Sequence, residues 1–312
     1  MTVTLQVAGA GVTYPRAQTE ALADIDLEVE AGQTLGIVGE SGSGKTTLGR
    51  LLVGTLSPSR GRVLVNGREW TKVDRRDPIR REIQMVFHDP YGALNPWMTA
   101  RQTVAEVFQV WHSLGRREAA ERADQVLGEV GISLDAAERR PGQLSGGQCQ
   151  RVGIARALAA DPSILIADEP TSSLDVSVQA QILNLLNALR VSRGLGIILI
   201  SHDLSVVNHV TDGTMVLFSG RLVERGATQT VLTAPAHPYT RVLLDSVPGV
   251  DGDFRFAANA VSADGCIFAP RCPLADGDCT ARPPARIAVG DTQVACIHPL
   301  TTNRQQPSEP TE

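Results

Sequence analysis

The feature that most constrains the fold of this chain is a glycine-rich segment, residues 39–46, which reads Gly-Glu-Ser-Gly-Ser-Gly-Lys-Thr. It matches the pattern G-x-x-x-x-G-K-[ST], and it lies between an apolar run, Thr34–Val38, and a helical segment, Thr47–Val53. Glycines let the backbone amides converge on phosphate oxygens, and the N-terminus of the following helix adds a partial positive charge. The order strand, motif, helix predicts a nucleotide phosphate-binding loop rather than a glycine-rich turn without a ligand.

The polar side chains of this loop have distinct expected roles. Lys45 is expected to bridge the β- and γ-phosphates of a nucleotide, and the Thr46 hydroxyl is expected to ligate Mg²⁺. The residues predicted to contact the nucleotide here are Gly39, Ser41, Gly42, Ser43, Gly44, Lys45, Thr46 and Thr47.

Two carboxylates follow a second apolar run, Ile164–Ala167. A strand of an open α/β sheet presents its C-terminal residues at the edge where ligands bind. Asp168 is suited to hold Mg²⁺, directly or through water, and Glu169 can polarise an attacking water as a general base. The alternative is a strand that ends in solvated acids, which the nearby phosphate loop disfavours.

The pattern of apolar runs changes twice along the chain. Up to about residue 235, short β-rich runs alternate with helical stretches, which predicts a mostly parallel sheet flanked by helices. Between Gln102 and Val130 the pattern is helical, which indicates an inserted subdomain. Beyond His237 the chain is rich in proline, glycine and cysteine with little periodicity. The predicted strands are Thr34–Val38, Arg62–Val65, Ile83–Phe87, Ile164–Ala167, Gly196–Ile200 and Thr214–Ser219.

Charge and hydropathy argue against a nucleic acid as the primary partner and against a membrane-spanning segment. The net charge of −5 gives no electrostatic footprint for a nucleic acid. The N-terminal residues lack the basic and apolar regions of a secretory signal, and the longest aliphatic stretch, Ile197–Ile200, is far too short to span a membrane. We therefore expect a cytosolic chain that reaches a membrane only by docking to another protein.

A third motif, Leu144-Ser-Gly-Gly-Gln148, lies between the phosphate loop and the acidic pair. In this order the motifs, over about residues 3–235, resemble the ATP-binding-cassette (ABC) family. The resemblance implies a P-loop ATPase core with a mostly parallel sheet, an antiparallel β portion at the N-terminus, an inserted helical subdomain at about 90–155, and a small irregular cysteine-rich extension. The corresponding domains are 1–235, 236–300 and a disordered tail, 301–312.

The resemblance also assigns roles by position. Tyr14 corresponds to the aromatic residue that stacks on adenine, and residues 172–175, with Asp175, correspond to a loop that communicates across a dimer interface. His202 corresponds to a histidine that contacts the γ-phosphate and orients the attacking water. The signature residues that would cap ATP bound to the opposite subunit are Ser145, Gly146, Gly147 and Gln148.

One position departs from the family pattern. His88 stands where the family has a glutamine, and Gln84 lies too early in the sequence to replace it. An imidazole accepts or donates one hydrogen bond at a time, whereas a carboxamide does both. We therefore expect slower or pH-sensitive hydrolysis, because histidine titrates near neutrality.

Four segments resemble importers of oligopeptides, dipeptides and nickel: residues 88–96, 222–226, 236–240 and 265–273. This resemblance implies a Mg²⁺-dependent ATPase at the cytoplasmic face of the inner or plasma membrane. Its implied partners are a second ABC ATPase subunit, two transmembrane permeases and an extracytoplasmic substrate-binding protein. A regulatory or partly degenerate cassette, and a non-transport ABC ATPase, stay open as alternatives.

Five cysteines are distributed unevenly, with Cys149 alone and four in the last fifth of the chain. Cys149 lies inside the predicted signature helix and is interpreted as a packing residue. The other four lack the C-x₂-C pairing typical of structural zinc. The C-terminal part of the chain resembles regions that carry a [4Fe–4S] cluster in some members of this branch, which makes such a cluster the first expectation, with zinc and free or reversibly oxidised thiols as alternatives. These candidate ligands are Cys266, Cys272, Cys279 and Cys296.

Overall fold

A computed structural model describes residues 2–15, 19–172, 174–246 and 265–300 of this chain. The tail expected to be disordered, 301–312, lies outside the described residues. Among the helices in the described ranges, none has the length and apolar character needed to cross a membrane.

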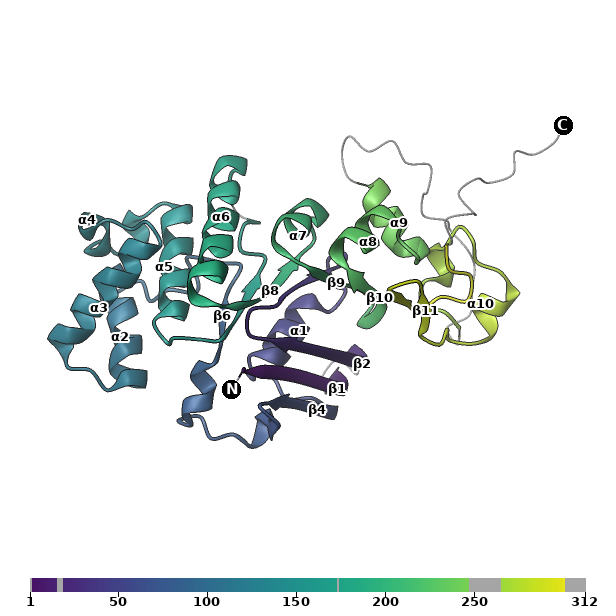
Figure 1. The fold of residues 1–312 in the computed structure, drawn as a ribbon, viewed down its shortest axis with the longest axis horizontal. Coiled ribbons are helices and arrows are strands. Elements are labelled where there is room, and N and C mark those ends of the chain that lie inside the picture. The colour runs from purple at the N-terminus through teal and green to yellow at the C-terminus, as the bar shows by residue number, and fades with distance from the viewer. Residues whose placement is uncertain (1, 16–18, 173, 247–264, 301–312) are drawn as a thin grey trace.

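The centre of the fold is an eight-stranded sheet with the strand order β11-β12-β10-β9-β3-β8-β7-β6 (Figure 1). Strands β9, β3, β8, β7 and β6 run parallel to one another, and β10, β12 and β11 are added antiparallel at one edge. Every residue of β3, β7 and β8 is buried, as expected for parallel strands covered on both faces. The strands of this sheet are β3 (Thr34–Val38), β6 (Ile83–Val86), β7 (Ile164–Asp168), β8 (Gly196–Ser201), β9 (Gly213–Phe218), β10 (Arg221–Ala227), β11 (Ile287–Val289) and β12 (Thr292–Val294).

A smaller antiparallel sheet covers one face of the central sheet. Its order is β2-β1-β4-β5, with β1 (Thr4–Tyr14), β2 (Thr19–Glu30), β4 (Arg60–Val65) and β5 (Arg68–Glu69). One hydrophobic cluster joins this sheet to α1 (Lys45–Leu52) and to one face of the parallel strands. The antiparallel N-terminal portion and the six predicted strands are thus confirmed, with ends that differ by one or two residues.

Helices cover the opposite face and one end of the molecule. A second cluster joins the other face of the parallel strands to α6 (Val176–Arg193), α7 (Leu204–Val210) and the inserted helices. The inserted helical subdomain lies at the end remote from the C-terminal region (Figure 1). It contains α2 (Ala100–His112), α3 (Arg116–Glu129), α4 (Leu134–Ala137), the 3-10 turn η3 (Pro141–Gln143) and α5 (Gly146–Leu158). The turns η1 (Trp70–Lys72) and η2 (Pro78–Arg81) precede β6.

The C-terminal region continues the central sheet instead of forming a separate layer. Strand β12 pairs with β10 through Glu224 opposite Val294 and Arg225 opposite Gln293. The region is more regular than the sequence suggested, because short strands at a sheet edge gain order from backbone pairing and need no apolar periodicity. Helix α8 (Thr228–Thr233) precedes this region, whose helical elements are α9 (Pro238–Asp245), the 3-10 turn η4 (Ala269–Arg271) and α10 (Gly277–Ala281).

Candidate functional site

The phosphate-binding loop connects β3 to α1 and depends on glycine at two points. A Cβ atom on Gly39 would lie 2.2 Å from the carbonyl oxygen of Leu217, so only glycine allows this approach to β9. Gly44 is the N-cap of α1 with φ of 100°, a conformation that other residues rarely adopt. The loop therefore turns tightly into the first turn of α1, where the backbone amides have no partner within the helix.

Lys45 is folded into this loop and is 5% exposed. Its Nζ atom donates hydrogen bonds to the carbonyl oxygens of Gly39 (2.7 Å) and Glu40 (2.8 Å). Burial lowers its pKa, and the nearby charges of Glu169 and Asp168 oppose that decrease. A cleft of about 430 Å³ opens over the loop; it is lined by Glu20, Ala21, Ser41, Gly42, Gly44, Lys45, Thr46, Thr47, Glu169, Ser219 and Gly220.

Asp168, the last residue of β7, is 1% exposed. Neither carboxylate oxygen has a hydrogen-bond partner of normal geometry among the described residues. Burial raises the pKa of Asp168, while the positive charge of His88, the Thr46 hydroxyl and Lys45 moderate the increase. A buried carboxylate without a partner is costly, and a divalent cation held with Thr46 would supply the missing interaction. The predicted Mg²⁺ ligands therefore suit that ion.

Glu169 and His202 follow neighbouring parallel strands and meet at their carboxyl ends. The His202 Nδ1 atom lies 3.2 Å from Oε1 of Glu169. Glu169 has φ of 45°, which is uncommon for a residue other than glycine, and its amide donates to the carbonyl of Ile200 in β8 (2.9 Å). Backbone strain of this kind is often kept at functional sites, where it directs a side chain.

His88 lies just after β6 and is exposed. It lies close enough to Asp168 for its charge to lower the pKa of that carboxyl. Gln84 instead donates from Nε2 to the carbonyl of Arg80 (3.0 Å) and is not among the residues that line the cleft. Gln84 therefore does not take the place of His88.

The signature residues begin helix α5. The Ser145 hydroxyl accepts a hydrogen bond from the amide of Gln148 (3.2 Å), and the Gln148 side chain accepts one from the amide of Ser145 (2.9 Å). This capping box fixes the helix N-terminus that includes Gly146 and Gly147. None of these four residues is among the described residues that line the cleft.

Two further expected residues have clear positions. The Tyr14 hydroxyl lies 3.4 Å from Oγ1 of Thr47, which brings the end of β1 to the phosphate loop. Asp175 caps α6 by accepting from the amide of Val178 (3.0 Å). Ser173, within the 172–175 loop, lies outside the described residues.

Four cysteines of the C-terminal region line one cavity with Phe268 and His298. They are Cys266, Cys272, Cys279 and Cys296, and none is in a disulfide. Burial raises the pKa of Cys272 to about 11 and that of Cys296 to about 12, so both would be thiols without a metal. Cys149 lies apart from them, fully buried in α5, with a sulfur contact to the carbonyl of Pro141 (3.5 Å).

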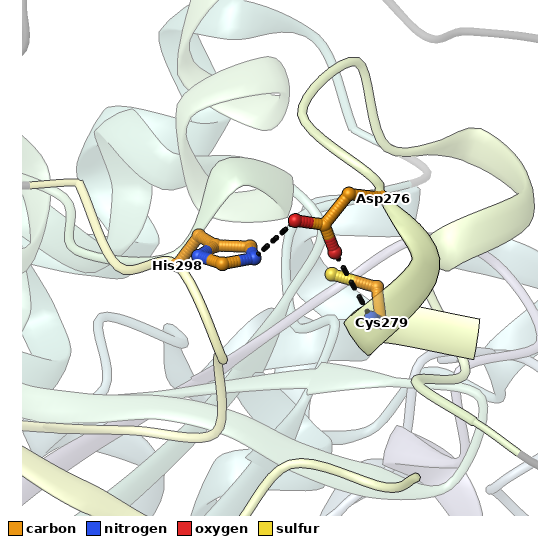
Figure 2. Close-up of side chains that lie close together, drawn as sticks. All are labelled: Asp276, Cys279 and His298. Atoms are coloured by element: carbon orange, nitrogen blue, oxygen red, sulfur yellow. Dashed lines mark hydrogen bonds and ion pairs between the residues drawn. The ribbon is translucent and has the colours of Figure 1, made fainter. Parts of the chain in front are cut away.

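Two potential ligands beside these cysteines have no sequence motif. The Nε2 atom of His298 lies 2.7 Å from Oδ2 of Asp276, and Asp276 also accepts from the amide of Cys279 (3.1 Å; Figure 2). Among the described residues, these three form the group whose ligand atoms all lie within 4.8 Å of one another. The sequence missed Asp276 and His298 because neither has the spacing of a metal motif.

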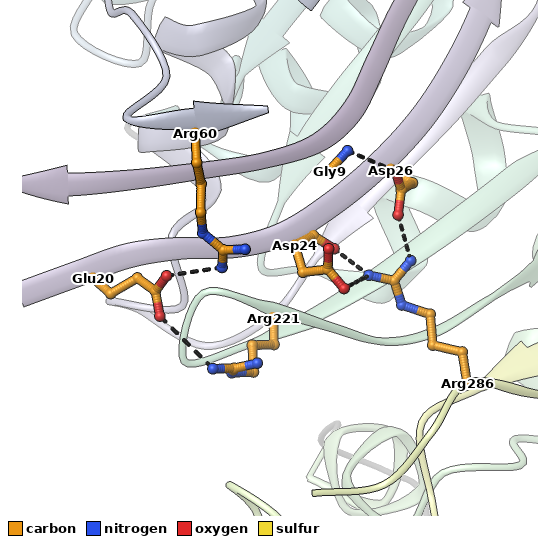
Figure 3. Close-up of polar contacts among 7 residues, drawn as sticks. All are labelled: Gly9, Glu20, Asp24, Asp26, Arg60, Arg221 and Arg286. Carbon is orange, nitrogen blue, oxygen red and sulfur yellow. Dashed lines mark hydrogen bonds and ion pairs between the residues drawn. The ribbon is translucent and has the colours of Figure 1, made fainter. Parts of the chain in front are cut away.

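The sequence also missed Glu20, which lines the nucleotide cleft from β2. Its carboxylate pairs with Arg60 (2.9 Å) and Arg221 (3.7 Å), side chains from β4 and β10 (Figure 3). Nothing in the local sequence around Glu20 indicates this placement, which arises from pairing between distant strands.

Comparisons with known proteins agree with these motifs. A family model described as "ABC transporter" matches residues 22–172. A second, described as "Oligopeptide/dipeptide transporter, C-terminal region", matches residues 223–279, which include three of the four clustered cysteines.

Individual relatives cover most of the chain. It is 44% identical over 291 residues to the "Probable peptide ABC transporter ATP-binding protein y4tS" of Sinorhizobium fredii, covering 89% of this chain and 82% of that protein. It is 40% identical over 298 residues to the "Dipeptide transport ATP-binding protein DppF" of Escherichia coli, covering 92% and 89%. The solved dimeric ATP-binding cassette MJ0796 bound to ADP and Pi is 30% identical, with a TM-score of 0.65, and the match covers 72% of this chain and 98% of that one. The chain therefore belongs to the ABC family as an ATPase coupled to transport, and it carries the C-terminal region of the oligopeptide/dipeptide branch.

Proposed function

We propose that this chain energises the uptake of oligopeptides, dipeptides or a similar small solute through separate membrane permease subunits. The observation that carries the proposal is the match of residues 223–279 to the C-terminal region of oligopeptide/dipeptide transporters, joined to a cassette whose phosphate and acidic motifs share one site. Relatives named for peptide and dipeptide transport support the solute class.

At the proposed nucleotide site each side chain has a role that its position suits. Lys45 and the loop amides hold the β- and γ-phosphates, and Tyr14 supports the adenine. Thr46 and Asp168 hold Mg²⁺, which offsets phosphate charge when bound. Glu169 accepts a proton from the attacking water, and His202, in contact with Glu169, orients that water. Residues 145–148 and Asp175 face the nucleotide of a second cassette.

The proposed assembly pairs this chain with an identical or homologous cassette, two permeases and an extracytoplasmic substrate-binding protein, at the cytoplasmic face of the membrane. Exposed aromatic side chains near the start of the helical subdomain support a protein partner there. Trp97 is 78% exposed, Tyr91 48% and Phe87 38%. Exposed aromatic residues are typical anchors of protein interfaces. The proposed division of the chain is a cassette at 1–235 and an extension at 236–300.

Purified complexes provide the test of solute class. Vesicles holding the permeases, this chain and its partner cassette should hydrolyse ATP faster when the binding protein carries a peptide than when it is empty. If peptides left the rate unchanged while another solute class raised it, the peptide assignment would fail.

A second candidate function is a regulatory, partly degenerate cassette, and the exposed His88 near Asp168 favours it. In that case the partner cassette hydrolyses most of the ATP. Turnover of the complex with Glu169 replaced by Gln in this chain alone distinguishes the two. A loss of most turnover supports the leading proposal, and a rate close to that of the native complex supports the regulatory one.

We further propose that the four clustered cysteines hold a structural metal centre, with [4Fe–4S] as the first candidate. Four thiols around one cavity form a suitable donor set. A single zinc ion, with Zn–S bonds of about 2.3 Å, needs its four sulfurs close together. In the described residues the ligand atoms that lie within 4.8 Å of one another are instead those of Asp276, Cys279 and His298, which favours a larger centre for the four cysteines.

Anaerobic purification followed by iron and zinc analysis tests this centre. Bound iron with an absorbance band near roughly 400 nm, lost in Cys272→Ser, is expected. Stoichiometric zinc would support the zinc alternative, and neither metal would support free thiols.

A further inference from the structure

The C-terminal region contacts the phosphate-binding loop at Glu40, the second residue of that loop. The two carboxylate oxygens of Glu40 accept hydrogen bonds from the two Nη atoms of Arg271, each at 2.8 Å. The Glu40 amide donates to the hydroxyl oxygen of Tyr239 at 2.9 Å. We propose that Arg271, with Tyr239, is a positioning residue for the phosphate-binding loop, so that the C-terminal region contributes to nucleotide binding in its own chain. This inference rests on the proposed nucleotide site at residues 39–46.

The contacts of Glu40 are connected to the lysine of the loop. The Glu40 carbonyl accepts from Nζ of Lys45 (2.8 Å) and from the amide of Ser43 (3.1 Å). The amide, the carbonyl and the carboxylate of Glu40 are therefore all held by named partners. A loop fixed in this way loses less conformational entropy when it closes on phosphates, and this preorganisation increases affinity.

Charge gives Arg271 a second effect. The Glu40 side chain is 32% exposed and would repel the phosphates of a bound nucleotide if it were unpaired. Its two-bond pairing with Arg271 fixes the carboxylate and offsets its charge. The same interaction raises the pKa of the Arg271 guanidinium, which stays charged throughout the working pH range.

The structure behind these contacts is well packed. Tyr239 is fully buried, and its ring centroid lies 4.7 Å from that of Phe218 in β9 and 5.4 Å from that of Phe268. The Arg271 guanidinium lies 5.6 Å from the Phe218 ring centroid. Aromatic contacts of this kind restrict the side chains, so the anchor of Glu40 is tied to the central sheet.

Arg271 ends a short turn that the clustered cysteines flank. The amide of Ala269 donates to the carbonyl of Cys266 (2.9 Å), and the amide of Cys272 donates to the carbonyl of Ala269 (3.3 Å). The backbone of this turn thus fixes the position from which the Arg271 side chain extends. The conformation of the chain around Cys266 and Cys272 therefore also determines the geometry of the contact between Arg271 and Glu40.

A separate ion pair on the same region provides a matched control. Arg286 pairs with Asp26 (2.7 Å) and Asp24 (3.2 Å) of β2, and it does not contact the phosphate loop in any described interaction (Figure 3). Replacing Arg286 therefore removes a similar arginine contact between the C-terminal region and the cassette without touching Glu40.

The test is calorimetric binding of MgADP to the full chain, with circular dichroism to verify folding. Arg271→Met should weaken binding about tenfold, since it removes two charge-assisted hydrogen bonds. Arg271→Lys should give a smaller loss, because an ammonium can still pair with one oxygen, and it replaces the methionine variant if that variant does not fold. The MgADP affinity of Arg286→Met should lie within about twofold of that of the native chain. When Glu40 is already replaced by glutamine, the added substitution Arg271→Met should weaken MgADP binding by less than about twofold, because the carboxylate that Arg271 pairs with is gone.

Several results would overturn the inference. One is native MgADP affinity in Arg271→Met together with loss of binding in Lys45→Ala. That result would support the nucleotide site but show that Arg271 has no role in it. A second is an equal loss of MgADP affinity in Arg271→Met and Arg286→Met. A third is a loss from Arg271→Met that is as large in the Glu40→Gln background as in the native chain. Either result would show that the effect of Arg271 does not act through Glu40. Native affinity in Lys45→Ala would refute the nucleotide site itself, and the inference with it.

Discussion

The Nδ1 atom of His202 lies 3.2 Å from Oε1 of Glu169, and the two residues follow the adjacent parallel strands β8 and β7. Parallel strands end at the same edge of a sheet, so residues 33 positions apart in sequence share one site. This contact connects the expected general base to the group expected to orient the water.

Replacing Glu169 by glutamine keeps the side-chain size and removes the proton acceptor. We expect ATP turnover to fall about 100-fold or more, while MgATP binding persists because Lys45 and the loop are unchanged. Phosphate release and calorimetry measure the two quantities. The exposed Glu118 of α3 gives a control, since Glu118→Gln should leave turnover unaltered. Turnover above half the native rate in Glu169→Gln would exclude this residue as the base.

Replacing His88 by glutamine should raise turnover. A carboxamide donates and accepts hydrogen bonds at once, whereas an imidazole does one at a time, so glutamine at this exposed position beside the Mg²⁺ ligands can hold two partners where histidine holds one. Phosphate release at saturating MgATP compares the two rates. A rate in His88→Gln equal to the native rate would show that His88 does not slow hydrolysis.

Acid should weaken the C-terminal region through His237. This residue is 1% exposed, its Nδ1 accepts from the amide of Tyr239 (3.0 Å), and burial lowers its pKa to about 3. The unfolded chain takes up the proton near the ordinary histidine pKa, so stability is lost as pH falls from about 6.5 toward 3. Between pH 7 and pH 5 we expect a loss of about 2 kcal/mol from this group.

The control for this prediction is His237→Asn, which retains an acceptor at the N-cap of α9 and does not titrate. Urea unfolding at both pH values gives the free energies of unfolding. If the native chain and His237→Asn lost equal stability between the two pH values, the neutral buried histidine would be disproved.

Trp97 is the exposed aromatic residue whose loss should affect the permeases most. Its side chain is 78% exposed, and truncation of a tryptophan anchor at an interface costs about 2 kcal/mol, or about 30-fold in affinity. Trp97→Ala should therefore reduce co-purification with the permeases while the ATPase rate of the isolated chain is preserved. Val191→Ala, at an 84% exposed position on α6, should leave co-purification intact. Equal effects of the two substitutions would place the permease contact elsewhere.

The sequence predicted the parts of this structure that depend on local patterns. The strand at Thr34–Val38, the glycine turn and the helix after it are contiguous, so one motif was sufficient to place Lys45 and Thr46. The role of Asp168 and Glu169 could be predicted because an apolar run ends in these two acidic residues, and a parallel sheet binds ligands at the carboxyl ends of its strands.

Contacts between distant segments could not be predicted in this way. Arg271 and Glu40 are 231 positions apart, and each belongs to a motif whose pattern carries no information about the other. Strands β11 and β12 have three residues each, too few for an alternating pattern, and they form because β10 offers an open edge. Asp276 and His298 likewise meet through the fold of the C-terminal region.

The most direct test of the central claim is ATP-dependent uptake of a labelled peptide into vesicles that contain the complete transporter. With native chain, uptake should require Mg²⁺, ATP and the peptide-loaded binding protein. With Glu169→Gln in this chain, uptake should fall to near the level without ATP, although the complex still assembles. Uptake at the native rate with Glu169→Gln would contradict the account, because hydrolysis at this chain's own site would then not energise transport.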